Sequence, residues 1–200
     1  MTQRHVIYCA HHVKDTVNYG CISSMVFYPF NRYVGQPLML GNPNGKITLV
    51  NTNANKGGHV LVNLAKRHPE WQFLGITQGY GHQITCDLPN VEYRPGSDDL
   101  REVLKDTSVL IMPSEREGMP TLGLEAMSLG LPIAPANIPA FRELGIARSG
   151  KFDEVIEYTL ADYYRIREQN VELINKIESE RNYQELRTFV EYIFDTADRI

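Results

Sequence analysis

The chain has 200 residues, of which 42% are hydrophobic and 22% are charged. This length suits one good-sized domain or two small ones, and the composition excludes a disordered or fibrous chain. Residues 151–200 carry 12 acidic and 7 basic side chains, whereas residues 1–150 carry 12 and 13. Neither segment is strongly basic, so nucleic acid is not expected as a partner.

The three cysteines, Cys9, Cys21 and Cys86, have no CxxC spacing, and an odd number cannot close a disulfide framework. They predict reduced thiols and therefore a cytoplasmic protein. The apolar run at residues 6–10 is too short for the core of a signal peptide. No stretch approaches the roughly 18 apolar residues of a membrane span, so we expect a soluble chain.

The first 45 residues contain two strand-like runs, 6–10 and 25–28, followed by a stretch rich in proline and glycine that is typical of a linker. From residue 46 to 150, short apolar runs alternate with helical patterns. The predicted strands are 47–50, 71–76, 91–93, 108–112 and 131–134. The predicted helices are 60–67, 100–104 and 122–129. Strands without polar alternation, separated by helices, predict a Rossmann-like three-layer α/β/α domain with a parallel sheet.

Residues 151–200 are acidic and show helical spacing of their apolar side chains. The two predicted apolar stripes consist of Val155, Ile156, Leu160, Tyr163 and Tyr164, and of Leu186, Phe189, Val190, Ile193, Phe194 and Ala197. We expect these C-terminal helices to pack against the α/β domain.

The stretch 113–127 follows a predicted strand, passes through a loop with glycine and proline, and opens a helix. The free N–H groups at 121–123 would face the carboxyl edge of the sheet and form an anion site that suits a diphosphate. Glu117 and Glu125 lie eight positions apart across this turn. Beside a diphosphate they would avoid repulsion by binding neutral hydroxyls on either side of it, so a nucleotide-sugar fits the pattern.

These residues make the sequence similar to the retaining group 1 glycosyltransferases of the GT-B fold. The resemblance covers about residues 45–145 and is specific because its motifs occur together in the family's order. Besides Glu117 and Glu125, the motifs are residues 47–51, 56–58, 69–73, 88–91, 113–114, 126–127, 130–132 and 139–143.

The resemblance implies the C-terminal, sugar-nucleotide-binding lobe of such an enzyme, working in polysaccharide or glycoconjugate biosynthesis. Carried over by position, Glu117 contacts the transferred sugar, Glu125 the ribose, and the amides of Thr121 and Leu122 the diphosphate, which Lys56 neutralises. The implied catalytic residues are Glu117 and Lys56. The implied donor-binding residues are Asn51, Lys56, Gly57, Arg94, Glu117, Gly118, Met119, Pro120, Thr121, Leu122 and Glu125. The donor would be a UDP- or GDP-sugar, with no metal and no cofactor.

Two departures from the family pattern leave alternatives open. Asn51 or a neighbour stands where many members have an arginine, although one branch of the family has asparagine there. Only residues 1–30 resemble the end of an acceptor lobe, so the chain is either a transferase or a non-catalytic subunit that needs a homodimer partner or a separate acceptor-lobe chain. A sugar-nucleotide epimerase of similar fold is a third, less favoured interpretation.

Each motif also has a purely structural interpretation. Glu125 in a first helical turn is stabilised by the helix dipole whatever its function. The run 56–58 can be a turn and a helix start, and Glu117 a solvated loop charge. For His11 and His12, we expect a surface or partly packed pair rather than a metal or catalytic site.

Overall fold

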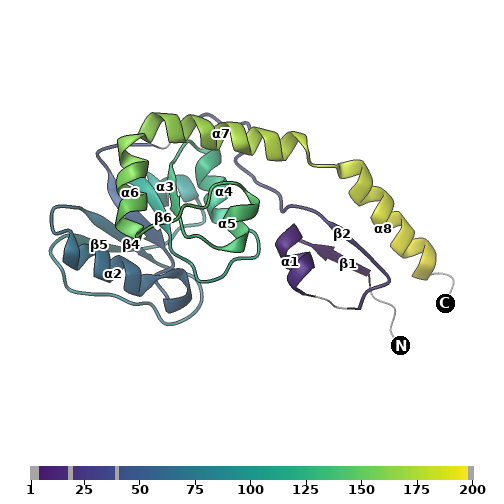
Figure 1. The fold of residues 1–200 in the computed structure, drawn as a ribbon, viewed down its shortest axis with the longest axis horizontal. Coiled ribbons are helices and arrows are strands. Elements are labelled where there is room, and N and C mark those ends of the chain that lie inside the picture. Colours follow the sequence, from purple (N-terminus) through teal and green to yellow (C-terminus); the bar gives the residue numbers. More distant parts are fainter. Residues whose placement is uncertain (1–4, 18–19, 39–40, 198–200) are drawn as a thin grey trace.

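The structure, a computed structural model, describes residues 5–17, 20–38 and 41–197 (Figure 1). Its main sheet has five parallel strands in the order β5-β4-β3-β6-β7. They are β3 (Lys46–Val50), β4 (Phe73–Thr77), β5 (Val91–Pro95), β6 (Thr107–Met112) and β7 (Ile133–Pro135). The predicted parallel α/β sheet is confirmed, and each strand lies within two residues of its predicted bounds.

Strand β6 shows that both faces of this sheet are covered by other parts of the protein. Successive side chains of a strand point to opposite faces. Val109 and Ile111 therefore join one hydrophobic cluster, while Leu110 and Met112 join another on the opposite face. All four side chains are buried, which is why the sequence shows no polar alternation here.

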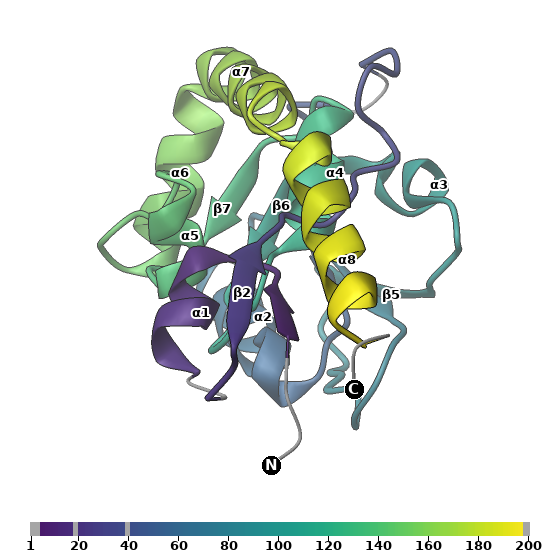
Figure 2. The same cartoon turned by 90° about the vertical axis from the view of Figure 1, so that its right-hand side faces the viewer.

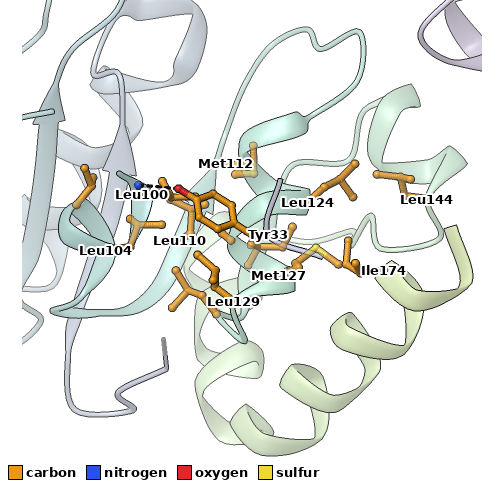
Figure 3. Packing of buried hydrophobic residues seen from close by; sticks show 14 of the residues in the cluster. Tyr33, Leu100, Leu104, Leu110, Met112, Leu124, Met127, Leu129, Leu144 and Ile174 are labelled. Carbon is orange, nitrogen blue, oxygen red and sulfur yellow. Dashed lines mark hydrogen bonds between the residues drawn. The ribbon is translucent and has the colours of Figure 1, made fainter. Parts of the chain in front are cut away.

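Helices form the two outer layers. On the face of Val109 lie α2 (Gly58–Arg67) and α6 (Phe152–Ala161). On the face of Leu110 lie α3 (Leu100–Leu104), α4 (Thr121–Ser128), α5 (Pro139–Glu143) and α7 (Tyr163–Ser179). Figure 3 shows this second cluster, where Met127 of α4 reaches Ile174 of α7. The three-layer architecture therefore has a buried core on each side of the sheet.

The N-terminal unit is a separate small element beside the main sheet (Figure 1). It consists of β1 (His5–Tyr8), α1 (His11–Thr16) and β2 (Ser23–Val26), and its two strands pair in parallel. Both strands were predicted from the sequence, with bounds that lie one or two residues later than those in the structure. The linker that follows runs along α4, where Asn31 donates a hydrogen bond to Ser128 at 2.7 Å.

Tyr33 anchors this linker in the core. Its ring is only 3% exposed and lies in the cluster around Leu110 and Met127 (Figure 3). The Tyr33 hydroxyl accepts a hydrogen bond from the backbone N–H of Leu100 at 3.1 Å, so the buried polar tip has a partner. The linker is thus bound to the α/β domain by side-chain burial as well as by the covalent chain.

The C-terminal helices depart from the expected packing. Helices α6 and α7 cover the α/β domain, but α8 (Tyr183–Ala197) lies against the N-terminal unit (Figure 2). Tyr183 packs on Phe27 with ring centroids 5.7 Å apart, and Tyr192 packs on His5 at 5.8 Å. The expectation that all of 151–200 packs on the α/β domain is therefore wrong for α8.

Two features explain this departure. The first predicted stripe is interrupted at Asp162, between α6 and α7, which leaves Tyr164 62% exposed. After α7, the Arg181 guanidinium donates to the carbonyl of Pro29 at 2.7 Å and fixes the turn into α8 at the linker. The interruption at Asp162 and the long-range contact of Arg181 with Pro29, together with the ring contacts of α8, give the chain its path. In the part of the chain that the structure describes, no helix has the length and apolarity to cross a bilayer.

Candidate functional site

A cavity of about 170 Å³ lies at the carboxyl ends of β3 and β6, beside the start of α4. Its lining residues are Leu49, Val50, Asn51, Lys56, Ile111, Met112, Ser114, Glu117, Met119, Pro120, Thr121 and Leu122. A larger cavity, of about 410 Å³, lies between the N-terminal unit and the junction of α7 with α8. We place the candidate site in the smaller cavity because open α/β sheets bind ligands at the carboxyl ends of their strands.

Asn51, at the end of β3, adopts a left-handed backbone conformation with φ of 62°. Asparagine tolerates this conformation better than most residues do. Its backbone N–H donates to Ile76 at 2.9 Å, and its side-chain oxygen accepts a hydrogen bond from Gln83 at 3.0 Å. The sharp exit from β3 is therefore fixed by hydrogen bonds at the edge of the cavity.

Lys56 is held at the cavity by the short 3-10 helix η1 (Ala54–Lys56). The Asn53 side chain caps this helix by accepting a hydrogen bond from the Lys56 N–H at 2.9 Å. Gly57 follows with φ of 91°, and a Cβ atom there would lie 2.4 Å from Cγ of Pro113. Only glycine allows this close approach, which brings η1 against the end of β6.

The ammonium group of Lys56 meets the carboxylate of Glu117 across the cavity. Lys56 Nζ lies 2.5 Å from Glu117 Oε1, and the Ser114 hydroxyl donates to the same oxygen at 2.7 Å. The Lys56 and Glu117 side chains are 24% and 10% exposed. The two implied catalytic residues therefore form one half-buried ion pair, and Glu117 points inward.

The start of α4 provides donors beside this pair. Pro120 at the N-cap offers no side-chain cap, and the amides of Leu122 and Gly123 have no hydrogen-bond partner among the described residues. The Thr121 amide, by contrast, donates to the carbonyl of Met119 at 2.8 Å. Of the amides expected to bind a diphosphate, the one of Leu122 is therefore free, the one of Thr121 is already bonded, and the amide of Gly123 is a further free donor.

Glu125 lies one turn further along α4 and does not line the cavity. Its carboxylate faces Arg32 of the linker, with Nε 3.6 Å from Oε1. Burial raises the pKa of Glu125, and the Arg32 charge opposes that effect. The structure therefore does not bring Glu125 together with Lys56 and Glu117. The Glu125 carboxylate contacts Arg32 of the linker instead.

Arg94, one of the implied donor-binding residues, does not join the site either. Its guanidinium pairs with Glu92 on the same strand and with Asp106 at 2.7 Å. Lys46 also pairs with Glu92. Arg94 is thus part of a charge network that joins β5 with the starts of β3 and β6, away from the cavity.

The N-terminal unit contacts the loop that carries Glu117 (residues 113–120, here the site loop). The His12 ring places Nε2 3.1 Å from the carbonyl oxygen of Glu117. A Cβ atom on Gly118 would lie 3.3 Å from the Cys9 sulfur. The expected surface or partly packed histidine pair is therefore partly packed at His12, whose side chain is 18% exposed.

Glu143 of α5 holds the N-terminal unit in this position. Its carboxylate accepts hydrogen bonds from the N–H groups of His11 and His12, each at 2.9 Å, and from the Tyr28 hydroxyl at 2.8 Å. The His12 ring adds a contact at 2.6 Å. Burial acts to raise the pKa of Glu143, but these hydrogen bonds outweigh burial and lower the pKa to about 2.

Sequence reasoning did not single out several of these residues. Ser114 was noted only as part of a motif, and Gln83 and Arg32 carry no local signal because their contacts are made across the fold. Among the described residues, no cluster of three or more histidine, cysteine, aspartate or glutamate side chains has the arrangement of a metal site.

Comparison with known proteins gives one family match. A family model described as "Glycosyl transferases group 1" matches residues 51–176. An uncharacterized glycosyltransferase of Haemophilus influenzae is 29% identical over 89 residues, which are 40% of this chain and 25% of that protein.

Solved structures resemble nearly the whole chain at low sequence identity. Sucrose-phosphate synthase from Thermosynechococcus elongatus is 15% identical with a TM-score of 0.66, covering 98% of this chain and 58% of its own. TarM is 13% identical with a TM-score of 0.65, covering 96% and 43%. The pneumococcal O-GlcNAc transferase GtfA, in complex with UDP and GlcNAc, is 13% identical with a TM-score of 0.60, covering 94% and 45%. At these identities the likeness shows the fold, and the chain spans a quarter to somewhat over half of these proteins.

Proposed function

The chain belongs to the group 1 glycosyltransferases, and on that premise we propose that it is the sugar-nucleotide-binding lobe of a retaining enzyme. The proposed reaction transfers a hexosyl group from a UDP- or GDP-sugar to a hydroxyl of a glycan, lipid or small molecule. The proposed enzyme uses no metal and no cofactor. The presence of UDP in the GtfA complex supports a nucleoside diphosphate as the shared part of the donor.

One observation carries this proposal: the Lys56–Glu117 pair faces the open start of α4 inside the cavity. A diphosphate that enters there receives hydrogen bonds from the amides of Leu122 and Gly123. It also competes with Glu117 for the Lys56 ammonium group. When Lys56 turns to the phosphates, the Glu117 carboxylate is released to accept hydrogen bonds from the hydroxyls of the sugar.

This exchange of partners supplies the transition-state stabilisation that retaining transfer needs. As the glycosidic bond to the diphosphate breaks, negative charge grows on the leaving phosphate and positive charge on the sugar. Lys56 and the two α4 amides stabilise the negative charge at positions fixed before the reaction starts. Glu117, on the sugar side, stabilises the positive one.

The cavity holds only part of the donor, because ligand pockets for whole small molecules usually measure about 300–1,000 Å³. We assign its roughly 170 Å³ to the diphosphate and the nearest atoms of the sugar. The nucleoside then extends past the start of α4 toward Glu125. For Glu125 to bind the ribose hydroxyls, Arg32 leaves its position 3.6 Å away. Any contact of residues 91–94 with the base comes from the backbone, since the Arg94 side chain is paired elsewhere.

Calorimetry with UDP, GDP and a panel of their sugars tests the proposal. We expect binding of one nucleotide series, and weaker binding when Lys56 is replaced by Gln. Lys66→Gln is the matched control, because Lys66 lies at the exposed far end of α2. Absence of binding for every nucleotide at millimolar concentration would refute the proposed function.

The second candidate is a partner-dependent subunit. It is favoured by the N-terminal unit, whose parallel sheet has only two strands and leaves Ile7 47% and Ile22 55% exposed. Parallel sheets are otherwise covered on both faces. Light scattering distinguishes the candidates: a monomer that transfers sugar unaided excludes this one, whereas a homodimer or a required second chain supports it. The cytoplasm stays the proposed compartment, on the support of three free cysteines.

A further inference from the structure

The contacts of His12 connect three elements that lie far apart in the sequence. On one side, Nδ1 of the ring lies 2.6 Å from Oε2 of Glu143, on α5. On the other side, Nε2 lies 3.1 Å from the carbonyl oxygen of Glu117, on the site loop. The ring of His12, on the N-terminal unit, therefore links α5 with the backbone of Glu117, the residue that pairs with Lys56.

Both partners of the ring are acceptors. A carbonyl oxygen only accepts hydrogen bonds, and an ionised carboxylate does the same. Glu143 is ionised because three other donors, the N–H groups of His11 and His12 and the Tyr28 hydroxyl, already point at its two oxygens. Both ring nitrogens of His12 therefore lie within hydrogen-bonding distance of an acceptor, one on α5 and one on the site loop.

Glu143 also fixes where the ring can point. It follows β7 on the short helix α5 and accepts the first two N–H groups of α1, so it sets both the position of α1 and the direction of the His12 side chain. Tyr28, at the end of the N-terminal unit, binds the same carboxylate. This fourfold contact leaves the ring little freedom.

We propose that His12 is a positioning residue: oriented by Glu143, it holds the site loop so that the Glu117 carboxylate faces Lys56. The effect on ligand binding rests on the proposed function, whereas the effect on the loop does not. The inference also gives the N-terminal unit a role at the site although none of its residues lines the cavity.

Amide hydrogen exchange in the free protein tests the positioning directly. The reporter is the Glu115 amide, which donates to the carbonyl of Asn55 at 3.1 Å and is protected only while the site loop stays closed. His12→Ala should speed its exchange by up to about tenfold, the size expected for losing one hydrogen bond. His12→Gln should restore part of the protection, because its amide nitrogen can still reach the Glu117 carbonyl.

His11→Ala is the matched control. His11 is the neighbouring residue on α1, and its ring packs on Tyr28 instead of the site loop. The control should leave the Glu115 exchange rate unchanged. Equal acceleration by both alanine variants, or no acceleration by His12→Ala, would overturn the proposal.

Glu143→Gln tests the orienting role. It should speed Glu115 exchange as His12→Ala does, and the double variant should be no faster than either single one, because both remove the same link. Fully additive effects would contradict a shared route.

Titration with UDP and GDP separates this inference from the proposed function. If both hold, His12→Ala weakens nucleotide-sugar binding severalfold while His11→Ala does not. If no nucleotide binds the unaltered protein, the proposed function fails, and the exchange rates still decide whether His12 positions the loop.

Discussion

Lys56 and Glu117 lie 61 positions apart in the sequence and form an ion pair with 2.5 Å between Nζ and Oε1. Each belongs to a different βα connection, after β3 and after β6, and these strands are neighbours in the sheet. In the free protein the two charges therefore neutralise each other. In the proposed function, where Lys56 binds the phosphates and Glu117 the sugar, a donor has to separate the two charges, and both become available to it at the same moment.

Replacing Lys56 with Gln should weaken binding of UDP or GDP by roughly ten- to a hundredfold. Hydrogen bonds to charged groups contribute about 1.5–3 kcal/mol, which is this factor in affinity. Calorimetry on the variant and on Lys66→Gln measures it. An unchanged dissociation constant for Lys56→Gln would show that the diphosphate lies elsewhere.

Replacing Glu117 with Gln should separate binding from transfer. The Lys56 ammonium loses its internal partner, so affinity for free UDP or GDP should hold or increase. Transfer should fall by about a hundred- to a thousandfold, since removing one stabilising group from a transition state has this effect. The neighbouring, exposed Glu115→Gln is the control, measured by nucleotide titration and by release of nucleotide from the donor. A parallel loss of affinity and rate would count against the partner exchange.

Gly57→Ala should destabilise the fold far more than Gly35→Ala. Both glycines have positive φ, 91° and 75°, so each substitution carries a backbone penalty of about 1 kcal/mol. Only at Gly57 does the added Cβ also meet Pro113, at 2.4 Å, whereas nothing lies within 4 Å at Gly35. We expect a further loss of about 1–3 kcal/mol at Gly57 from this overlap. Denaturant unfolding of the two variants gives the difference.

The low pKa of Glu143 predicts a loss of stability in acid. Its pKa falls from an ordinary value of 4.5 to about 2 in the folded chain, so the unfolded chain binds the proton more readily. The carboxylate therefore stabilises the fold fully above about pH 4.5, and this contribution is lost as pH falls toward 2. Glu143→Gln lacks it at every pH, so the unfolding free energies of variant and unaltered protein should converge in acid. Glu172→Gln, at an exposed position of α7, is the control for the substitution itself, and its free energy of unfolding at neutral pH should stay close to that of the unaltered protein.

The sheet could be predicted from the sequence because its signals are local. The runs around Val109 and Leu49 are mostly apolar and contain no charged residue, and the loops between them contain residues that end helices and strands. The path of α8 could not be predicted in this way. It depends on Arg181 binding the carbonyl of Pro29, and no spacing in the sequence records a contact between residues so far apart.

In the candidate site, too, the features with local sequence signals could be predicted, and those that depend on contacts across the fold could not. Lys56, Glu117 and the start of α4 were predicted from motifs, and the structure brings them together at one cavity. The positions of Arg94 and Glu125 could not be predicted in this way. Arg94 pairs with Asp106 and Glu125 faces Arg32, and the local sequence does not indicate either pair. The role of His12 depends on Glu143, 131 positions away.

Helix α8 packs against the N-terminal unit. The unit and α8 together are therefore joined to the rest of the molecule by two covalent connections, one after β2 and one after α7. Two connections restrict the movement of this unit relative to the α/β domain more than one connection would. A movement that separates His12 from Glu117 would also have to break the hydrogen bonds that the unit makes with Glu143. Cutting the chain after α7 would leave the linker after β2 as the single covalent connection of the unit.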